Sequence, residues 1–575
     1  MIQYLRITVL TLIFSNLIQA QYPQNYFQSP LDIPLILSGT YGELRSNHFH
    51  AGIDIKTQGV EGLNVRAAAS GEVVRIAVSP YGYGNALYVR HPNGYTTVYA
   101  HLQSFDADIQ KWVEEKQYAQ KSFYVNLFPP AGTFPVMQGD VIAKSGNSGG
   151  SGGPHLHFEI RDSRTEEPIN PLLFGYEIDD HRTPEVRGVY AYPLNAESHL
   201  NQRHARTELS LRTIRNGEYA FRWTQRGAGQ IGFAIDVIDR LDGAWNSNGP
   251  FKIEQFVNGS KTNEFRAERF AFAETRYLNA HIDYDLYDCC SKKINRMWIL
   301  PSNALRMYSG TEQNGILTVE ADSSYDLQWK ISDVAGNVTL LNGSIRYEAL
   351  ADSSSTSSDL QIPHNSVFNI DWGSFYANLG IDVLYESADV DTTIRSGLDF
   401  CYGSIYQIGR TGIPVHKHYR VGLSLADVPV KYHSKAVVVS LDDNLNSPDS
   451  WDGDVQIHNS QPFIEARVRT MGNFTLMVDS VPPAVRVLSG IRSGQQLSTG
   501  SVIKLKMTDD LSGIQSYDCY IDGQWHLMSY DAKYDLLEVE LSNRIPNGEH
   551  EFKVIVTDDR NNKTEVRIPF SYSIR

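Results

Sequence analysis

Hydrophobic and polar residues alternate over short segments along most of this chain, which is the pattern of β-strands with one buried face. Thr97–His101 and Tyr325–Ser332 are examples. Turns rich in Gly, Asn and Asp separate such segments, and helical periodicity is scarce beyond residue 180. The pattern predicts a mainly β protein, with β-sandwiches in its later part.

The length and the turn-rich segments indicate several domains. The chain has 575 residues, whereas single hydrophobic cores stop growing at roughly 250–300 residues. Asp180–Pro184, the serine-rich segment Ala351–Ser358 and Asp479–Pro483 are candidate boundaries. We therefore expect a leader at 1–20, an antiparallel-sheet domain at 21–180 with an insertion at 103–138, and three β-sandwich-like domains at 184–350, 363–480 and 481–575, with a linker at 351–362.

An internal repeat supports the first and last sandwiches. Two strand-and-turn segments occur twice: Ile231–Gly243 and Val502–Gly513 form one pair, and Tyr325–Asn337 and His550–Asn562 form the other. The earlier copy is longer, and we place its excess near Thr262–Gly310, with a helix expected at Glu264–Leu278. Both copies resemble the immunoglobulin-like modules that are common in secreted bacterial proteins.

The first twenty residues have the form of a secretory signal peptide. Arg6 precedes an apolar run, Ile7–Ile18, and Ala20 provides a small residue before the expected cleavage point at Gln21. The run is too short for a membrane span, and no other stretch has the roughly 18–20 apolar residues of a transmembrane helix. We expect an exported protein without a transmembrane segment, either periplasmic, at the cell surface or extracellular.

Composition narrows the possible partners. The net charge of −15 argues against nucleic acid and against electrostatic attachment to an anionic wall or membrane.

Four cysteines are too few for a disulfide framework, and a cysteine zinc site is not expected without a C-x-x-C pair. Cys289 and Cys290 are adjacent, and because a bond between neighbours would be strained, we expect free buried thiols or one long-range bridge. The other two cysteines are Cys401 and Cys519.

Two short motifs carry candidate metal chemistry: His50-Ala-Gly-Ile-Asp54 and, about a hundred residues later, His155-Leu-His157. Two imidazoles and one carboxylate are a ligand set of catalytic zinc sites, which keep a fourth position for water. If residues 50–54 were extended, His50 and Asp54 would lie roughly 13 Å apart, at about 3.3 Å per residue. One ion cannot bridge that gap, so the segment must bend, and Gly52 allows the bend.

Not every histidine near these motifs needs to bind the ion. His155 and His157 share one face of a strand as an i, i+2 pair, so one can ligate while the other faces whatever the ion activates. His101 ends the strand that follows the Asn-Gly turn at 93–94. We therefore expect His101 close to the two motifs.

These motifs resemble the lysostaphin-type zinc endopeptidases, peptidase family M23, which cut peptide bonds in bacterial peptidoglycan. The resemblance covers about residues 28–176 and includes Tyr99–Leu102, Gly139–Ala143 and Ser148–Glu159. It implies an N-terminal metallopeptidase domain. By motif position, it also implies that Zn²⁺ is held by His50, Asp54 and His157, and that the reacting water and the substrate carbonyl are lined by His101 and His155.

The chain departs from this family at 103–138, where the family has a much shorter connection. We expect a helix at Asp106–Ala119 within this insertion. The insertion either shapes or covers the cleft beside the catalytic strand, or it is a surface elaboration without a catalytic role.

The sequence leaves three functions open. The favoured one is a secreted zinc endopeptidase that binds peptidoglycan peptide stems and cuts their cross-links during wall remodelling. The second is a non-catalytic envelope scaffold, or an activator of other wall hydrolases, with an occluded zinc site and envelope protein partners bound through the β-sandwich domains. The third keeps the chemistry but acts on secreted proteins with glycine-rich segments. The five intact histidine and aspartate residues favour the first.

Overall fold

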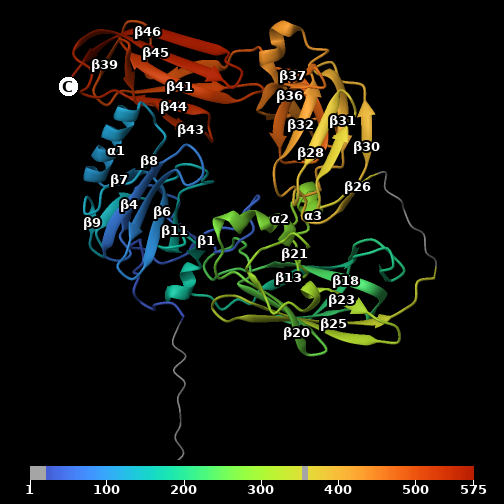
Figure 1. Ribbon diagram of the computed structural model, residues 1–575. Helices are drawn as coiled ribbons and strands as arrows, with labels where there is room; N and C mark the ends of the chain where they lie inside the picture. The colour runs from blue at the N-terminus through green and yellow to red at the C-terminus, as the bar shows by residue number, and fades with distance from the viewer. Residues whose placement is uncertain (1–20, 352–359, 575) are drawn as a thin grey trace, which may run out of the picture.

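The computed structural model describes residues 21–351 and 360–574 (Figure 1). The expected signal peptide, residues 1–20, and most of the expected linker at 351–362 lie outside these ranges. The described part is mainly β, as predicted, with β-sheet domains following an N-terminal domain. It contains no helix that is both long and apolar enough to cross a membrane.

The N-terminal domain is built on an antiparallel sheet (blue in Figure 1). Its main strands, in spatial order, are β1 (Leu37–Gly39), β2 (Ile53–Lys56), β11 (His155–Asp162), β6 (Tyr95–Leu102), β5 (Asn85–Arg90), β4 (Gly71–Val78) and β8 (Val125–Leu127). Ile55, Leu156 and Phe158 are fully buried in an apolar core on one face of this sheet. Because side chains alternate along a strand, His155 and His157 lie on the other face.

The insertion at 103–138 extends the sheet at the edge far from β2. Its helix α1 (Ala107–Gln120) confirms the expected helix, and the Asp106 side chain caps it by accepting a hydrogen bond from the backbone N–H of Asp108. β8 and β9 (Pro135–Val136) both pair with β4. Ile109 and Val113 of the helix are buried in the core of the sheet, so the insertion is an integral part of the domain.

The second domain forms a sandwich around Trp329, which is fully buried. The long strand β18 (Gln225–Ile238) pairs with β13 (Glu185–Pro193) along its second half and with β25 (Val338–Tyr347) at its start, so it belongs to both sheets. The second of these sheets continues from β25 through β24 (Ser324–Ser332), β19 (Lys252–Val257) and β20 (Ser260–Arg266).

The prediction of a helix at Glu264–Leu278 is wrong. The start of this segment belongs to strand β20, where Phe265 is buried and pairs with Ile253. Helical structure begins only at Phe272, as a 3₁₀ turn (Phe272–Tyr277) that leads into α2 (Leu278–His281) and α3 (Tyr284–Cys290). Cross-strand packing in the sheet outweighs the local helical pattern of the first residues.

The cysteines also differ from the expectation of free thiols or one long-range bridge. Cys289 and Cys290 form a disulfide bond with each other in the last turn of α3, where the backbone leaves the helix at Ser291. In the described part of the chain Cys401 and Cys519 are free. Cys519 is buried in the core of the last domain, whereas Cys401 lies in the preceding domain, so the fold separates them.

Two further sandwiches complete the chain. Within 360–479, one sheet contains β27 (Phe368–Asp371), β28 (Phe375–Leu379), β32 (Tyr419–Ser424), β36 (Gln461–Val468) and β35 (Gly453–His458), and the other contains β30 (Thr392–Arg395), β31 (Tyr402–Ile408), β37 (Gly472–Val478), β33 (Ala436–Leu441) and β34 (Asp449–Trp451). In the last domain, one sheet contains β38 (Ala484–Ser489), β40 (Val502–Thr508), β44 (Leu536–Glu540) and β43 (Ser529–Asp531), and the other contains β39 (Gln495–Ser498), β46 (Lys563–Ser573), β45 (Gly548–Asp558), β41 (Ile514–Ile521) and β42 (Gln524–His526). In each domain the two sheets share one apolar core.

The last domain returns to the first, so the chain closes into a ring (Figure 1, red beside α1). Tyr118 of α1 packs edge-on against Trp525, with ring centroids 5.6 Å apart, and the Arg544 guanidinium stacks 4.0 Å above the Tyr118 ring. Lys533 also donates a hydrogen bond to the carbonyl oxygen of Asn147. The insertion and the segment around Asn147 therefore both contact the C-terminal domain.

Candidate active site

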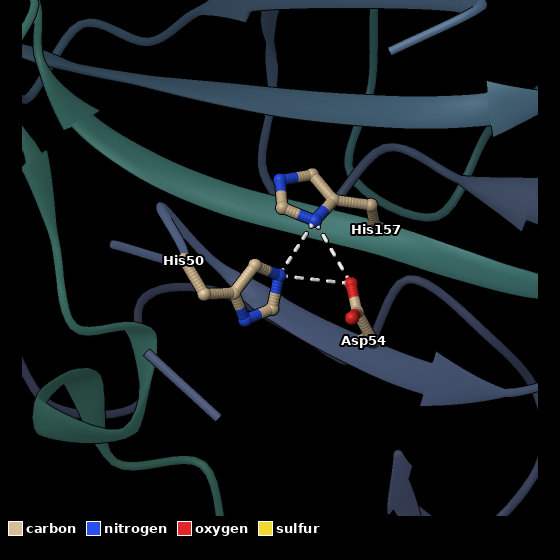
Figure 2. A group of neighbouring side chains, drawn as sticks. All are labelled: His50, Asp54 and His157. Atoms are coloured by element: carbon tan, nitrogen blue, oxygen red, sulfur yellow. Dashed lines mark hydrogen bonds and ion pairs between the residues drawn. The ribbon is translucent and has the colours of Figure 1, made fainter. Parts of the chain in front are cut away.

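Three candidate ligands converge where β2 and β11 run side by side (Figure 2). Asp54 pairs directly across the ladder with His157, so their side chains share one face of the sheet. His50 precedes β2, and the chain bends at Gly52, as expected. His50 Nε2 lies 3.0 Å from Asp54 Oδ1 and 3.0 Å from His157 Nδ1. The third distance, His157 Nδ1 to Asp54 Oδ1, is 2.9 Å.

Gly52 permits a close approach between strands. A Cβ atom at this position would lie 2.3 Å from the carbonyl oxygen of Phe158 in β11. A side chain here would push β2 away from β11 and separate Asp54 from His157.

The outer nitrogens of the two imidazoles determine which lone pairs face inward. His50 Nδ1 lies 2.8 Å from the carbonyl oxygen of Thr40, which can only accept, so this nitrogen carries the proton and Nε2 is left with its lone pair. His157 Nε2 lies 2.9 Å from Oε1 of Glu159 and donates to that carboxylate, which leaves Nδ1 as the inward donor of electrons. When both rings are neutral, two nitrogen lone pairs and a carboxylate oxygen point at one position, which is the donor set of a divalent metal ion.

Glu159 supports this arrangement from the next position on the same face of β11. Its side chain is fully buried, and it accepts hydrogen bonds from Arg161 Nε (2.6 Å) and from the Tyr83 hydroxyl (2.5 Å) as well as from His157. Burial alone would raise its pKa, but the positive charge of Arg161 and the hydrogen bond from His157 outweigh burial and lower the pKa of Glu159 to about 2. Glu159 therefore stays ionised at all physiological pH values and holds the His157 ring.

A Glu159→Gln variant is expected to bind zinc about 10–100-fold more weakly, because the anion that orients His157 is lost. Its free energy of unfolding is also expected to fall by about 3–5 kcal/mol, since the buried Arg161 loses its buried carboxylate partner and keeps only the exposed Glu166. Zinc competition titration and chemical denaturation measure the two effects. Glu166→Gln is the matched control, because Glu166 is exposed and lies 3.6 Å from the same arginine. Equal zinc affinities in the two variants would contradict the role of Glu159.

Arg45 fixes the remaining carboxylate oxygen of the cluster. Its Nη2 donates to Oδ2 of Asp54 at 2.8 Å and to Glu43 at 3.0 Å. This contact leaves Oδ1 of Asp54 turned toward the two imidazoles. Arg45 lies in a loop before β2 and belongs to no motif of the sequence, so sequence reasoning missed it.

His101 and His155 face each other beside the cluster, with ring centroids 4.8 Å apart. His101 Nδ1 lies 2.8 Å from the carbonyl oxygen of Ser148, and His155 Nδ1 lies 2.8 Å from that of Gly153. In both rings Nδ1 therefore carries a proton, and in the neutral ring Nε2 has the lone pair. His155 Nε2 is 3.4 Å from Asp54 Oδ1, so this ring borders the candidate metal position.

A bulge turns His101 toward the other histidines. The pairing of β5 with β6 shifts register between Asn85 and Leu87, and His101 itself has a left-handed backbone with φ of 58°. A non-glycine residue in this region stores strain and is often found at functional sites. Burial, together with the nearby His157 and His155, lowers the pKa of His101 to about 3, so the ring stays neutral.

A cavity of about 660 Å³ opens over these side chains. The first domain contributes the five predicted site residues and Tyr83, and the second domain contributes Phe272 and Thr275. Thr275 also accepts a hydrogen bond from the backbone N–H of Phe49 at 2.9 Å, which ties this wall to the site. Among the described residues that line the cavity, none belongs to the 103–138 insertion, so the insertion does not cover the cleft.

Two models of protein families match parts of this chain. The model of peptidase family M23 matches residues 48–121, and that of a Zu5-like domain matches residues 360–479. A protein of Neisseria meningitidis, "DD-carboxypeptidase/endopeptidase Mpg", is 36% identical over 129 residues, which cover 22% of this chain and 23% of that protein. "Cell division protein DipM" of Caulobacter vibrioides is 28% identical over 125 residues, which cover 20% of this chain and 17% of that protein.

Among solved structures, the catalytic domain of lysostaphin from Staphylococcus simulans is 24% identical, with a TM-score of 0.19, and the match covers 24% of this chain and 91% of that domain. The chain thus spans less than a quarter of the length of the Neisseria relative, and the likeness lies in one domain. The N-terminal part of this chain is a domain of peptidase family M23.

Proposed function

We propose that this protein is an exported, zinc-dependent endopeptidase that cleaves the peptide cross-links of bacterial peptidoglycan. The observation that carries the proposal is the convergence of His50, Asp54 and His157 beside two further histidines in an open cleft. The names of the Neisseria and Caulobacter relatives support a substrate in the cell wall. The apolar run at 7–18 supports export.

The donor set fits zinc, because two imidazole nitrogens and one carboxylate oxygen are typical ligands of its catalytic sites. Zinc held there would act as a Lewis acid that polarises a peptide carbonyl and lowers the pKa of a water molecule to near 7. Glu159, supported by Tyr83, orients His157, Arg45 orients Asp54, and the carbonyl oxygen of Thr40 orients His50, so that little reorganisation accompanies binding.

His101 and His155 would carry the proton during peptide hydrolysis. Each ring is anchored through Nδ1 to a backbone carbonyl and presents Nε2 to the cleft. A neutral Nε2 can accept the proton of the attacking water, and the resulting imidazolium can donate it to the leaving amine. We assign this exchange to the pair without dividing the two steps between them.

Digestion of purified peptidoglycan by the mature protein tests the proposal. We expect cross-linked muropeptides to be converted to uncross-linked products, as measured by chromatography and mass spectrometry. A chelator is expected to stop the conversion, and added zinc to restore it. Tight binding to sacculi without any new product would instead support the competing function, a non-catalytic scaffold. Cleavage of glycine-rich proteins with intact muropeptides would move the substrate to secreted proteins.

A further inference from the structure

A second group of carboxylates lies at the junction between the peptidase domain and the first sandwich. Asp180 lies between the two domains, Asp239 directly follows β18, and Asp333 directly follows β24. One oxygen from each carboxylate lies within 4.8 Å of the others. Asp239 and Asp333 are 3% and 5% exposed, and Asp180 is 9% exposed. We call these three residues the aspartate cluster.

Two buried oxygen atoms at this place lack partners. Asp239 Oδ1 has no hydrogen-bond donor among the described residues, and the same holds for the hydroxyl of Thr40, which is 8% exposed. Thr40 belongs to the peptidase domain, and it lines the same cavity of about 120 Å³ as the three aspartates. Burying polar atoms without a hydrogen-bond partner costs free energy. We therefore expect this cavity to hold a ligand that oxygen atoms can coordinate.

Basic residues lie near the cluster, among them Arg182 near Asp239 and His181 near Asp180. None of the three carboxylates forms an ion pair with a lysine, arginine or histidine in the part of the chain that the structure describes. Asp333 is instead fixed by backbone donors, since its Oδ1 accepts from the N–H groups of Gly336 (2.8 Å) and Asn337 (2.9 Å). Burial, together with the nearby Asp333 and Asp180, raises the pKa of Asp239 to about 8.

The internal repeat reproduces this arrangement at the other end of the chain. Asp479, Asp509 and Asp558 occupy the corresponding positions in the last domain and also lie within 4.8 Å of one another. Asn337 donates to the carbonyl oxygen of Asp180 at 3.1 Å, and Asn562 donates to that of Asp479 at 3.1 Å. In the second cluster the carboxylates accept hydrogen bonds from backbone N–H groups, for example Asp479 from Ser512 at 3.1 Å. Among the described residues, the first cluster differs in that one of its own carboxylate oxygens, Asp239 Oδ1, lacks a hydrogen-bond donor.

We propose that the aspartate cluster binds a calcium ion that fastens the peptidase domain to the first sandwich. The donors are oxygen atoms from several chain segments, which suits a hard cation with flexible coordination by six to eight oxygens. Magnesium requires a stricter octahedral shell and keeps more of its water, and transition metals prefer nitrogen or sulfur donors. The cavity leaves room for water molecules that complete the shell. This proposal is independent of the peptidase function.

Terbium luminescence of the mature full-length protein tests the proposal. The histidine site is first saturated with zinc, so that the lanthanide occupies other positions. Tyr41 and Tyr176 line the cavity and are expected to sensitise emission from Tb³⁺ bound there. We expect Ca²⁺ to displace Tb³⁺ and to raise the melting temperature of the zinc-loaded protein, because it binds the native state. Mg²⁺ at the same concentration is expected to do neither.

Variants locate the ion. Asp239→Asn and Asp180→Asn are each expected to weaken Tb³⁺ binding at least tenfold, whereas Asp509→Asn, in the second cluster, retains it. In calcium-free buffer Asp239→Asn is expected to melt no lower than the parent protein, because it removes a carboxyl group that burial and two neighbouring carboxylates make costly to ionise. Such a melting temperature shows that the variant is folded. Unchanged binding in both first-cluster variants, loss of binding in Asp509→Asn, or equal displacement by Mg²⁺ would overturn the proposal.

Discussion

Replacing His157 or Asp54 with alanine is expected to abolish both zinc binding and peptidoglycan cleavage. Each residue contributes one of the three inward electron pairs, and the neighbouring strands hold them 2.9 Å apart. With one donor removed, the remaining two cannot hold a catalytic ion against exchange into solvent. The expected loss of activity exceeds about a thousandfold, because the Lewis acid disappears together with its water.

Metal analysis of the purified variants and muropeptide digestion measure these two losses. His204→Ala is the matched control, since His204 is an exposed histidine of the second domain and is expected to keep full metal content and activity. Circular dichroism separates loss of metal from loss of fold. Full activity in either ligand variant would refute the assignment of zinc to this site.

Replacing His155 with alanine is expected to leave the zinc content unchanged and to reduce turnover. His155 does not belong to the group that converges within 3.0 Å, but its Nε2 borders Asp54 at 3.4 Å and opens to the cleft. Proton transfer by a positioned side chain contributes about 10²–10⁴-fold in rate, so kcat is expected to fall by that factor. KM is expected to change little, because the ring acts at the reacting bond and does not bind the more distant parts of the substrate.

Metal content and steady-state kinetics on a soluble cross-linked peptide check this separation. A variant that loses zinc in proportion to its activity would make His155 a ligand. A variant with unchanged kcat would leave His101 as the one histidine that moves the proton.

Within each motif the sequence was sufficient to place the candidate residues, because the geometry there is local, whereas the resemblance to the M23 family implied that the motifs meet in one site. The H-x-x-x-D spacing requires a bend, the H-x-H spacing places both rings on one face of a strand, and His101 ends an adjacent strand. Glu159 could have been found by the same alternation, since it follows His157 on that face. The roles of these residues remain predictions.

Other parts of the site depend on packing between distant segments, and no local sequence pattern predicts them. Arg45 reaches Asp54 from an irregular loop, and Phe272 and Thr275 enter the cleft from another domain. The 103–138 insertion has a clear helical pattern, but its place at the far edge of the sheet is set by pairing with β4. The same limit applies to Cys289 and Cys290, whose bond depends on how α3 ends.

The pairing of Asp54 with His157 makes the site sensitive to the alignment of β2 and β11. A slip of one residue between these strands would turn both histidines of β11 to the opposite side of the sheet. Leu156 and Phe158 prevent the slip, because it would bring these two fully buried side chains out of the core. The placement of the metal-binding atoms is therefore maintained by apolar residues that never meet the substrate.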